Sequence, residues 1–297
     1  MKGIILSFVL TVTALCVGSS FAREPGSLEQ DETAVKPIFS LKTDDREPLF
    51  GDRFTLKAGY KIWVAKWQAQ ASAVPTSQTQ VNSDHPSAMN GPTVTGILKL
   101  RESAWFNSAF INFTWQRDGF DFAEQFNSGD HFFANRRDYS ITGGVAIWEG
   151  LGIFAGYYDS RQEFTNQPNA PGSTVERHPR SLRGPIVGVF ANVPMSERVS
   201  FYGNLAYAQL KFRGIQVPPN FIADTNSAQG WMNEIGVSIT GPRVWRIGTE
   251  LQLGFRAQIV QKNFGAGATG GAPPAGTNQH PLHDLTYGPI FAVNAVF

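Results

Sequence analysis

The histidines are the first candidates for chemistry, because an imidazole beside a carboxylate can act as a general base or bind a metal. All five are predicted to lie in long loops: His85, His131, His178, His280 and His283. Three of them adjoin an aspartate, in Asp84-His85, Asp130-His131 and His283-Asp284. Adjacent residues on a strand point to opposite faces, so none of these pairs is spaced to act as one catalytic unit. His280 and His283 lack a third firm ligand, and we predict neither a metal site nor a cofactor.

A second set of candidates consists of charged side chains that alternate with apolar ones. Eight are predicted to face the interior of a closed sheet: Lys57, Lys61, Lys99, Arg101, Glu234, Arg246, Glu250 and Arg256. Two interpretations are open. The two glutamates could pair with basic groups to fill a narrow lumen, since charges hidden from water must be paired. Alternatively, the excess of basic groups could form an anion-selective constriction.

Strands with a period of two must position these side chains. Between residues 245 and 259 every charge falls on one face, opposite apolar residues such as Ile247, Leu251 and Phe255. The last stretch, 284–297, also has one apolar face and one mixed, small and polar face, and it closes on Phe297. Such alternation indicates strands whose two sides meet different environments.

The N-terminal region is predicted to be processed and then polar. Residues 1–22 read as a secretory leader, with an apolar run that ends at Ser20-Phe21-Ala22, and Cys16 is removed with it. Residues 23–52 are acidic and proline-containing, which predicts a flexible periplasmic extension; a folded plug is the less favoured alternative. The net charge of +1 provides no basic stripe for nucleic acid.

Ten strands are predicted over residues 53–297, with short and long connections strictly alternating. The long connections are expected at 68–91, 118–137, 164–181, 213–229 and 263–283, and the last two strands at 244–262 and 284–297. Aromatic residues gather near the strand ends, as in the girdles of membrane barrels. The fold class is therefore all-β, a transmembrane antiparallel up-and-down β-barrel.

The leader, the alternation, the loop rhythm and the terminal Phe297 together resemble bacterial outer-membrane β-barrel proteins. The resemblance implies a location in the Gram-negative outer membrane, in contact with lipid and lipopolysaccharide. It also implies that periplasmic chaperones and the barrel-assembly machinery handle the chain, with Phe297 as the assembly signal. We expect a monomer. The strand number is similar to that of the outer-membrane proteases, but those space the residues of each catalytic pair by one so that both share a face. The adjacent pairs here do not match, and we predict that the protein is not an enzyme.

The predicted loop 118–137 is rich in phenylalanine: Phe120, Phe122, Phe126, Phe132 and Phe133. A solvated loop does not need so many. The favoured interpretation is that two strands extend beyond the membrane and these rings pack together or cap the barrel. The alternative is an apolar vestibule for a small molecule at the barrel mouth. Arg136 and Arg137, where this loop returns, are candidates for contact with lipopolysaccharide phosphates.

A barrel of about ten strands leaves little free bore. Six further aromatic side chains are predicted to occupy it: Phe106, Phe110, Trp148, Phe154, Tyr158 and Tyr202. We therefore favour a packed network over an open pore. The first function hypothesis is restricted passage or binding of a small molecule through the narrow lumen. The alternative is a non-conducting surface barrel whose extracellular loops make contacts, and an outer-membrane hydrolase carries the least weight.

Overall fold

The computed structural model describes residues 50, 53–70, 80–100, 106–122, 131–148, 150–167, 176–214, 227–262 and 282–297. The chain divides into two units, Met1–Leu41 and Lys42–Phe297, and every described element belongs to the second. The predicted leader, 1–22, and all of the predicted extension, 23–52, except residue 50 lie outside the described residues. In the described part of the chain, no helix is long and apolar enough to cross a membrane.

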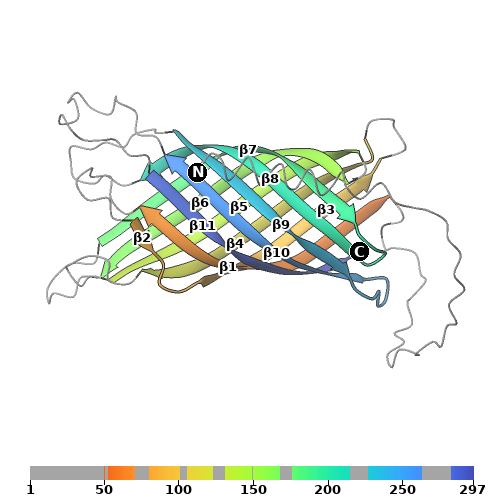
Figure 1. The fold of residues 1–297 in the computed structure, drawn as a ribbon, viewed down its shortest axis with the longest axis horizontal. Helices are drawn as coiled ribbons and strands as arrows, with labels where there is room; N and C mark the ends of the chain where they lie inside the picture. The colour runs from red at the N-terminus through yellow and green to blue at the C-terminus, as the bar shows by residue number, and fades with distance from the viewer. Residues whose placement is uncertain are drawn as a thin grey trace, which may run out of the picture. The chain divides into compact units, whose positions relative to one another are not determined.

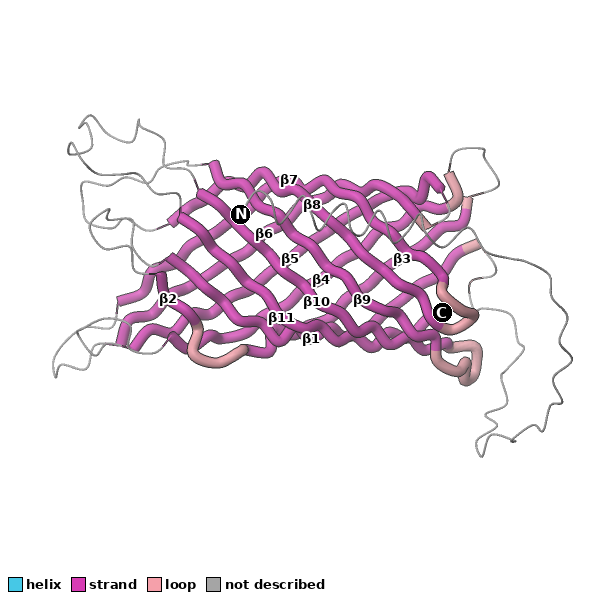
Figure 2. Tube along the Cα trace, viewed as in Figure 1, coloured by secondary structure: helices cyan, strands magenta, loops and turns pink. Residues whose placement is uncertain are grey.

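The second unit is a sheet of antiparallel strands that closes on itself (Figures 1 and 2). Its strands are β1 (Phe54–Gln70), β2 (Gln80–Asn82), β3 (Ser87–Lys99), β4 (Ser108–Phe122), β5 (His131–Trp148), β6 (Leu151–Gln167), β7 (Glu176–Pro194), β8 (Val199–Gly214), β9 (Ser227–Thr240), β10 (Gly248–Lys262) and β11 (Leu282–Val296). Except for the short β2, which pairs only with the end of β1, each strand pairs with its neighbours in sequence. The ring therefore holds the ten predicted strands, and the predicted fold class is confirmed.

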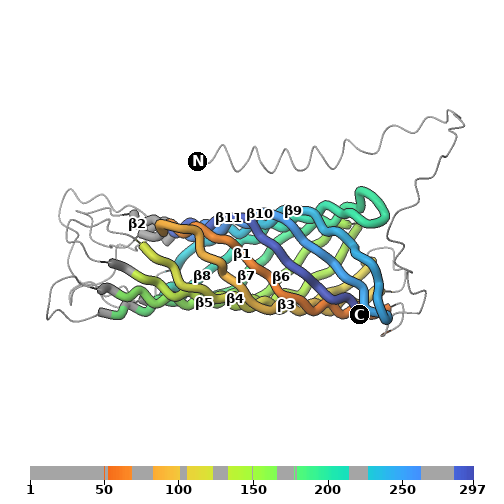
Figure 3. Tube along the Cα trace, turned by 90° about the horizontal axis from the view of Figure 1, so that it is seen from below, coloured from red at the N-terminus to blue at the C-terminus, as the bar shows by residue number. Residues whose placement is uncertain are grey.

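The first and last strands close the ring. β1 and β11 pair along their length, with Ala58 opposite Ala295 and Trp63 opposite Ile290 (Figure 3). The pairing continues to the last residue, because the Phe297 amide donates to the Leu56 carbonyl at 2.8 Å and the Leu56 amide donates back at 3.2 Å. We call the end of the barrel that carries Phe297 and the turns at 195–198 and 241–247 the turn end, and the opposite end the loop end.

The two faces of each strand have opposite surroundings, as the period of two predicted. In β11, Ile290 and Ala292 are buried inside the barrel, whereas Phe291 and Val293 between and beyond them are 44% and 60% exposed. The mixed face of the last strand is therefore the interior one. A closed barrel leaves no free strand edge, so this alternation satisfies the backbone and sorts the side chains at the same time.

Several strands extend further at the loop end than predicted. β4 continues to Phe122 and β5 begins at His131, so most of the predicted loop 118–137 is strand. Likewise β6 continues to Gln167 and β7 begins at Glu176, within the predicted loop 164–181. The prediction that the histidines lie in loops was therefore wrong for three of them, because His131, His178 and His283 fall within β5, β7 and β11. It was right for His85, between β2 and β3, and His280 lies outside the described residues.

At the turn end, β10 begins at Gly248 and not at the predicted Val244. Val244 and Ile247 pair as a tight hairpin, and the two residues between them adopt left-handed backbone angles, with φ of 55° at Trp245 and 71° at Arg246. A two-residue hairpin of type I′ has positive φ at both central positions, which usually selects Asn and Gly. The predicted strand was therefore too long at this end, because residues 245–247 belong to a turn and not to the alternating strand.

Interior aromatic rings in the turn-end half lie on glycines of neighbouring strands. A side chain added at Gly144 would meet the Phe110 ring at 2.6 Å, and one at Gly188 would meet the Phe154 ring at 2.6 Å. Tyr202 covers glycines of β9 and β10 in the same way. Phe110 and Phe154 thus fill the lumen as predicted, whereas Phe106 and Trp148 do not, since they are 42% and 69% exposed near the turn end.

Candidate functional site

The interior of the barrel is crossed by ion pairs, beginning in the turn-end half. Lys57 of β1 contacts Glu250 of β10, which also accepts hydrogen bonds from the amides of Gln252 at 2.6 Å and Asn294 at 3.2 Å. Four residues further along β1, Lys61 donates to both carboxylate oxygens of Glu234 on β9, each at 2.6 Å. β11 alone separates the strands of the first pair, and β11 and β10 separate those of the second, so both contacts bridge over intervening strands on the inside of the barrel.

Arg256 forms the next level. Its guanidinium lies over the Trp63 ring, 4.6 Å from the centroid, and donates to the Gln116 side chain of β4 at 3.0 Å. Trp63 and Gln116 are both fully buried. The indole face attracts the guanidinium by a cation–π interaction, and the amide oxygen accepts one of its hydrogen bonds.

Arg136 of β5 is the centre of the interior network. It binds Asp138 with two hydrogen bonds, from Nε at 3.0 Å and from Nη2 at 2.9 Å. The other donors reach Thr286 of β11 at 2.6 Å and Gln258 of β10 at 3.0 Å. Because β10 is the fifth strand from β5 in a ring of ten, Arg136 joins opposite walls of the barrel. A fully buried charge with this many partners is held in one geometry.

Aromatic side chains close the lumen above Arg136, towards the loop end. The Trp67 ring lies against the Arg136 guanidinium, with 5.2 Å between the ring centroid and Cζ. The Trp67 indole N–H donates to Asp284. The Trp67 ring packs against Phe120, Phe122 and Phe164 at centroid distances of 5.1, 5.5 and 5.2 Å. All four of these rings are buried. The lumen is therefore filled by side chains at this level.

The structure brings five of the eight predicted lumen residues together: Lys57, Lys61, Glu234, Glu250 and Arg256. Lys99 lies on the turn-end edge and is exposed, and Arg246 lies in the 244–247 turn, outside the lumen. Arg101 lies outside the described residues. Whether any of these side chains selects anions stays a prediction.

Sequence reasoning missed the deepest part of the network. Arg136 was assigned to an outer contact because residues 118–137 were expected to form a loop; the extension of β5 turns it inward instead. Asp138, two residues further, shares its face, and this spacing on one strand is the signal that could have identified the pair.

The phenylalanines of the predicted loop divide between two faces. Phe120 and Phe122 point into the barrel and belong to the aromatic cluster, while Phe133 is 38% exposed on the outside. Phe126 and the side chain of Phe132 lie outside the described set. Extension of two strands beyond the membrane, with rings packed together, was the favoured interpretation and agrees with β4 and β5. Within the described residues, no three His, Cys, Asp or Glu side chains gather as a metal site.

The outer surface of the barrel carries an apolar belt. Exposed, outward-facing residues along the middle of the strands are apolar: Ile111, Ile141, Ile153, Val187, Val189, Leu251, Phe255, Phe291 and Val293. Contact of this belt with water would be unfavourable in free energy, whereas contact with the hydrocarbon of a bilayer is not. The fold is therefore that of a transmembrane β-barrel of the outer-membrane type.

No protein-family profile matches the chain, and no curated protein matches it. Among solved structures, the outer-membrane protease OmpT of Escherichia coli is 10% identical, with 83% of this chain and 96% of that one covered and a TM-score of 0.40. The translocator domain of the autotransporter NalP of Neisseria meningitidis is 11% identical, with 82% and 88% covered and a TM-score of 0.40. Ail of Yersinia pestis is 11% identical, with 82% and 98% covered and a TM-score of 0.29. No functional conclusion is based on likenesses at this level.

Proposed function

We propose that the protein is a non-conducting outer-membrane barrel, which acts through its outer surface and its loop end and not through its lumen. The observation that carries this proposal is the crossing of the lumen by Arg136, whose partners Thr286 and Gln258 lie on the far wall. Below it lie Trp63 and Gln116, and above it lies the cluster around Trp67, all of them inaccessible to water. A solute would have to break a buried ion pair and displace several rings in order to pass.

Conductance in planar lipid bilayers tests the proposal. The refolded protein, checked for the gel mobility shift that barrels show on boiling, should produce no discrete current steps. A triple variant, Arg136→Ala with Trp67→Ala and Phe122→Ala, should open an aqueous path and conduct, provided that it still shows the gel shift. The matched control Arg137→Ala, on the outer face of the same strand, should stay silent. Steps from the unaltered protein would overturn the proposal.

Restricted passage remains the second candidate, because one observation favours it. The side chains of the turn-end pairs keep some contact with solvent: 25% and 9% for Lys57 and Glu250, and 12% and 11% for Lys61 and Glu234. Water therefore enters the lumen from the turn end as far as these pairs. If the unaltered protein conducts anions in preference to cations and Lys61→Gln abolishes that preference, this second function replaces the first.

A further inference from the structure

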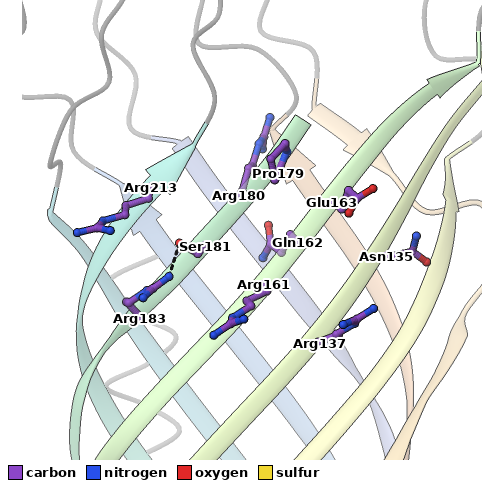
Figure 4. Close-up of a pocket in the computed structure, with 10 residues that line it drawn as sticks. All are labelled: Asn135, Arg137, Arg161, Gln162, Glu163, Pro179, Arg180, Ser181, Arg183 and Arg213. Carbon is purple, nitrogen blue, oxygen red and sulfur yellow. Dashed lines mark hydrogen bonds between the residues drawn. The ribbon is translucent and has the colours of Figure 1, made fainter. Parts of the chain in front are cut away.

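The outer surface at the loop end carries an arginine-rich depression. It has a volume of about 570 Å³, and five arginines and a single glutamate are among the residues that line it. Four of these arginines come from four successive strands, Arg137 of β5, Arg161 of β6, Arg183 of β7 and Arg213 of β8 (Figure 4). We call these four residues the arginine face.

Like charges stand directly opposite one another on this side of the barrel. Arg117 of β4 pairs in register with Arg137, and Arg137 pairs in register with Arg161, so three arginines form one row across three strands. Arg183 of β7 likewise pairs in register with Lys211 of β8. Like charges at directly opposed positions destabilise a sheet. A row of this kind is therefore expected where an external anion compensates the cations.

The few acidic groups nearby do not neutralise the arginine face. Asp159 contacts Arg161 at 3.3 Å and also lies opposite Arg183 in register, so one carboxylate serves two arginines. Glu163 contacts Arg177 at 3.8 Å. Arg183 makes one long hydrogen bond to Ser181, at 3.5 Å, and among the described residues its buried Nε–H finds no hydrogen-bond partner. Arg137 and Arg213 are exposed, with no carboxylate within salt-bridge distance among the described residues. Arg137 and Arg213 therefore present guanidinium donors outward without a carboxylate acceptor among the described residues.

The level of the arginine face identifies the kind of anion. Along β5 the outward residues run from Ile141 to Tyr139 to Arg137, and along β8 from Leu205 through Tyr207 to Lys211 and Arg213. Apolar residues give way first to aromatic and then to basic ones, which is the order of hydrocarbon, interface and charged headgroup across a leaflet. Arg161 lies 6.0 Å from the Tyr139 ring centroid, so the cations begin where the aromatic belt ends.

We propose that the arginine face binds the phosphates of a phosphorylated glycolipid in the outer leaflet, the headgroup class of lipopolysaccharide. The planar guanidinium donates bidentate hydrogen bonds to phosphate oxygens, and four of them on neighbouring strands can engage two phosphates on one saccharide headgroup. The loop end faces this leaflet, because in outer-membrane barrels the short turns lie on the periplasmic side and the longer connections outside. This proposal is independent of whether the lumen conducts.

The test measures affinity for bisphosphorylated lipid A in neutral detergent by titration calorimetry. The variant Arg137→Gln with Arg183→Gln and Arg213→Gln removes three charges and keeps the Arg161 contact with Asp159. Affinity should fall roughly a hundredfold, since each of the three cations near a charged lipid surface contributes about a factor of five. The matched control removes three exposed cations at the turn end, with Lys99→Gln, Arg198→Gln and Arg246→Gln, and should change affinity less than about threefold.

A second measurement compares melting temperatures with and without lipid A, and the effect of one substitution should have opposite signs in the two conditions. The single variant Arg137→Gln relieves the row of like charges, so in lipid-free neutral detergent it should melt about 2–4 °C higher than the unaltered barrel. With saturating lipid A it should melt lower, because a phosphate contact is lost. Equal loss of affinity in the turn-end control would overturn the proposal. So would unchanged binding of lipid A from which both phosphates have been removed, or full competition by millimolar inorganic phosphate.

Discussion

Exchange of Arg136 for methionine separates the two partners of the buried ion pair and should be the most damaging single change in the lumen. It leaves the Asp138 carboxylate, only 4% exposed, without a positive partner and with a neutral donor, the Tyr158 hydroxyl, at 2.8 Å. Removing one partner of a buried pair costs about 3–5 kcal/mol of the free energy of unfolding. Asp138→Leu should cost a similar amount, because it leaves the Arg136 charge with neutral acceptors only.

The double variant, Arg136→Met with Asp138→Leu, should be less destabilised than either single variant. It removes both charges, and the Gln258 amide still donates to Tyr158 at 2.8 Å. The groups that lose a partner are neutral: Thr286 and Gln258 each lose the Arg136 donor, and the Tyr158 hydroxyl loses its Asp138 acceptor. We expect a loss of about 1–2 kcal/mol, hence a coupling free energy of about 3 kcal/mol or more between the two sites. Urea unfolding in lipid vesicles, followed by tryptophan fluorescence, measures each free energy.

The exposed pair Arg161 and Asp159 provides the matched control for this cycle. Its side chains are 61% and 16% exposed, and the two residues are also two positions apart on one strand. Its coupling free energy should lie below about 1 kcal/mol. Additive single effects at Arg136 and Asp138, or a coupling no larger than that of the control pair, would refute the conclusion that the lumen depends on this bridge.

Three further predictions concern packing and backbone. Phe120→Ala should lower the free energy of unfolding by about 3–5 kcal/mol, because it empties part of the Trp67 cluster. Phe133→Ala on the outer face should lower it by less than about 1 kcal/mol, and urea midpoints compare the two variants. Gly188→Ala should destabilise by about 1–3 kcal/mol, because its Cβ would meet the Phe154 ring at 2.6 Å, whereas Gly203→Ala, whose nearest neighbour is at 3.5 Å, should stay near neutral in the same titration. Trp245→Asn with Arg246→Gly should stabilise the barrel by about 1 kcal/mol, since both positions have positive φ; a lowered urea midpoint would show that the turn is not strained.

The alternation of side chains made the barrel predictable from sequence, and it was most informative where the two faces differ most. In β10 and β11 the outer residues are apolar and the inner ones polar or small, so the strands and their faces were correctly identified. The signal faded where strands leave the membrane. Beyond Tyr139 on β5 the outward residues are Arg137 and Asn135, which read like a loop although the ladder continues.

Contacts inside the lumen could not be predicted, because they join strands that are far apart in sequence and do not pair with each other. The sequence placed Lys61 and Glu234 on interior faces, but 173 positions separate them and nothing local fixes the shear that brings them to one level. The hairpin at Trp245 and Arg246 was missed for a different reason. Neither residue type is a usual choice for positive φ, so its turn carried no chemical signal.

Two adjacent arginines show how one strand assigns opposite tasks to the same residue type. Arg136 points inward, where hydrogen bonds to Asp138, Thr286 and Gln258 occupy its donors and rings stack on its face. Arg137 points outward and meets an arginine on each neighbouring strand. The first has every requirement met within the chain, whereas the second is stabilised only if something outside the chain supplies negative charge. Positive charge without a compensating carboxylate therefore lies on the outer surface at Arg137, and that is where an anionic ligand would gain most by binding.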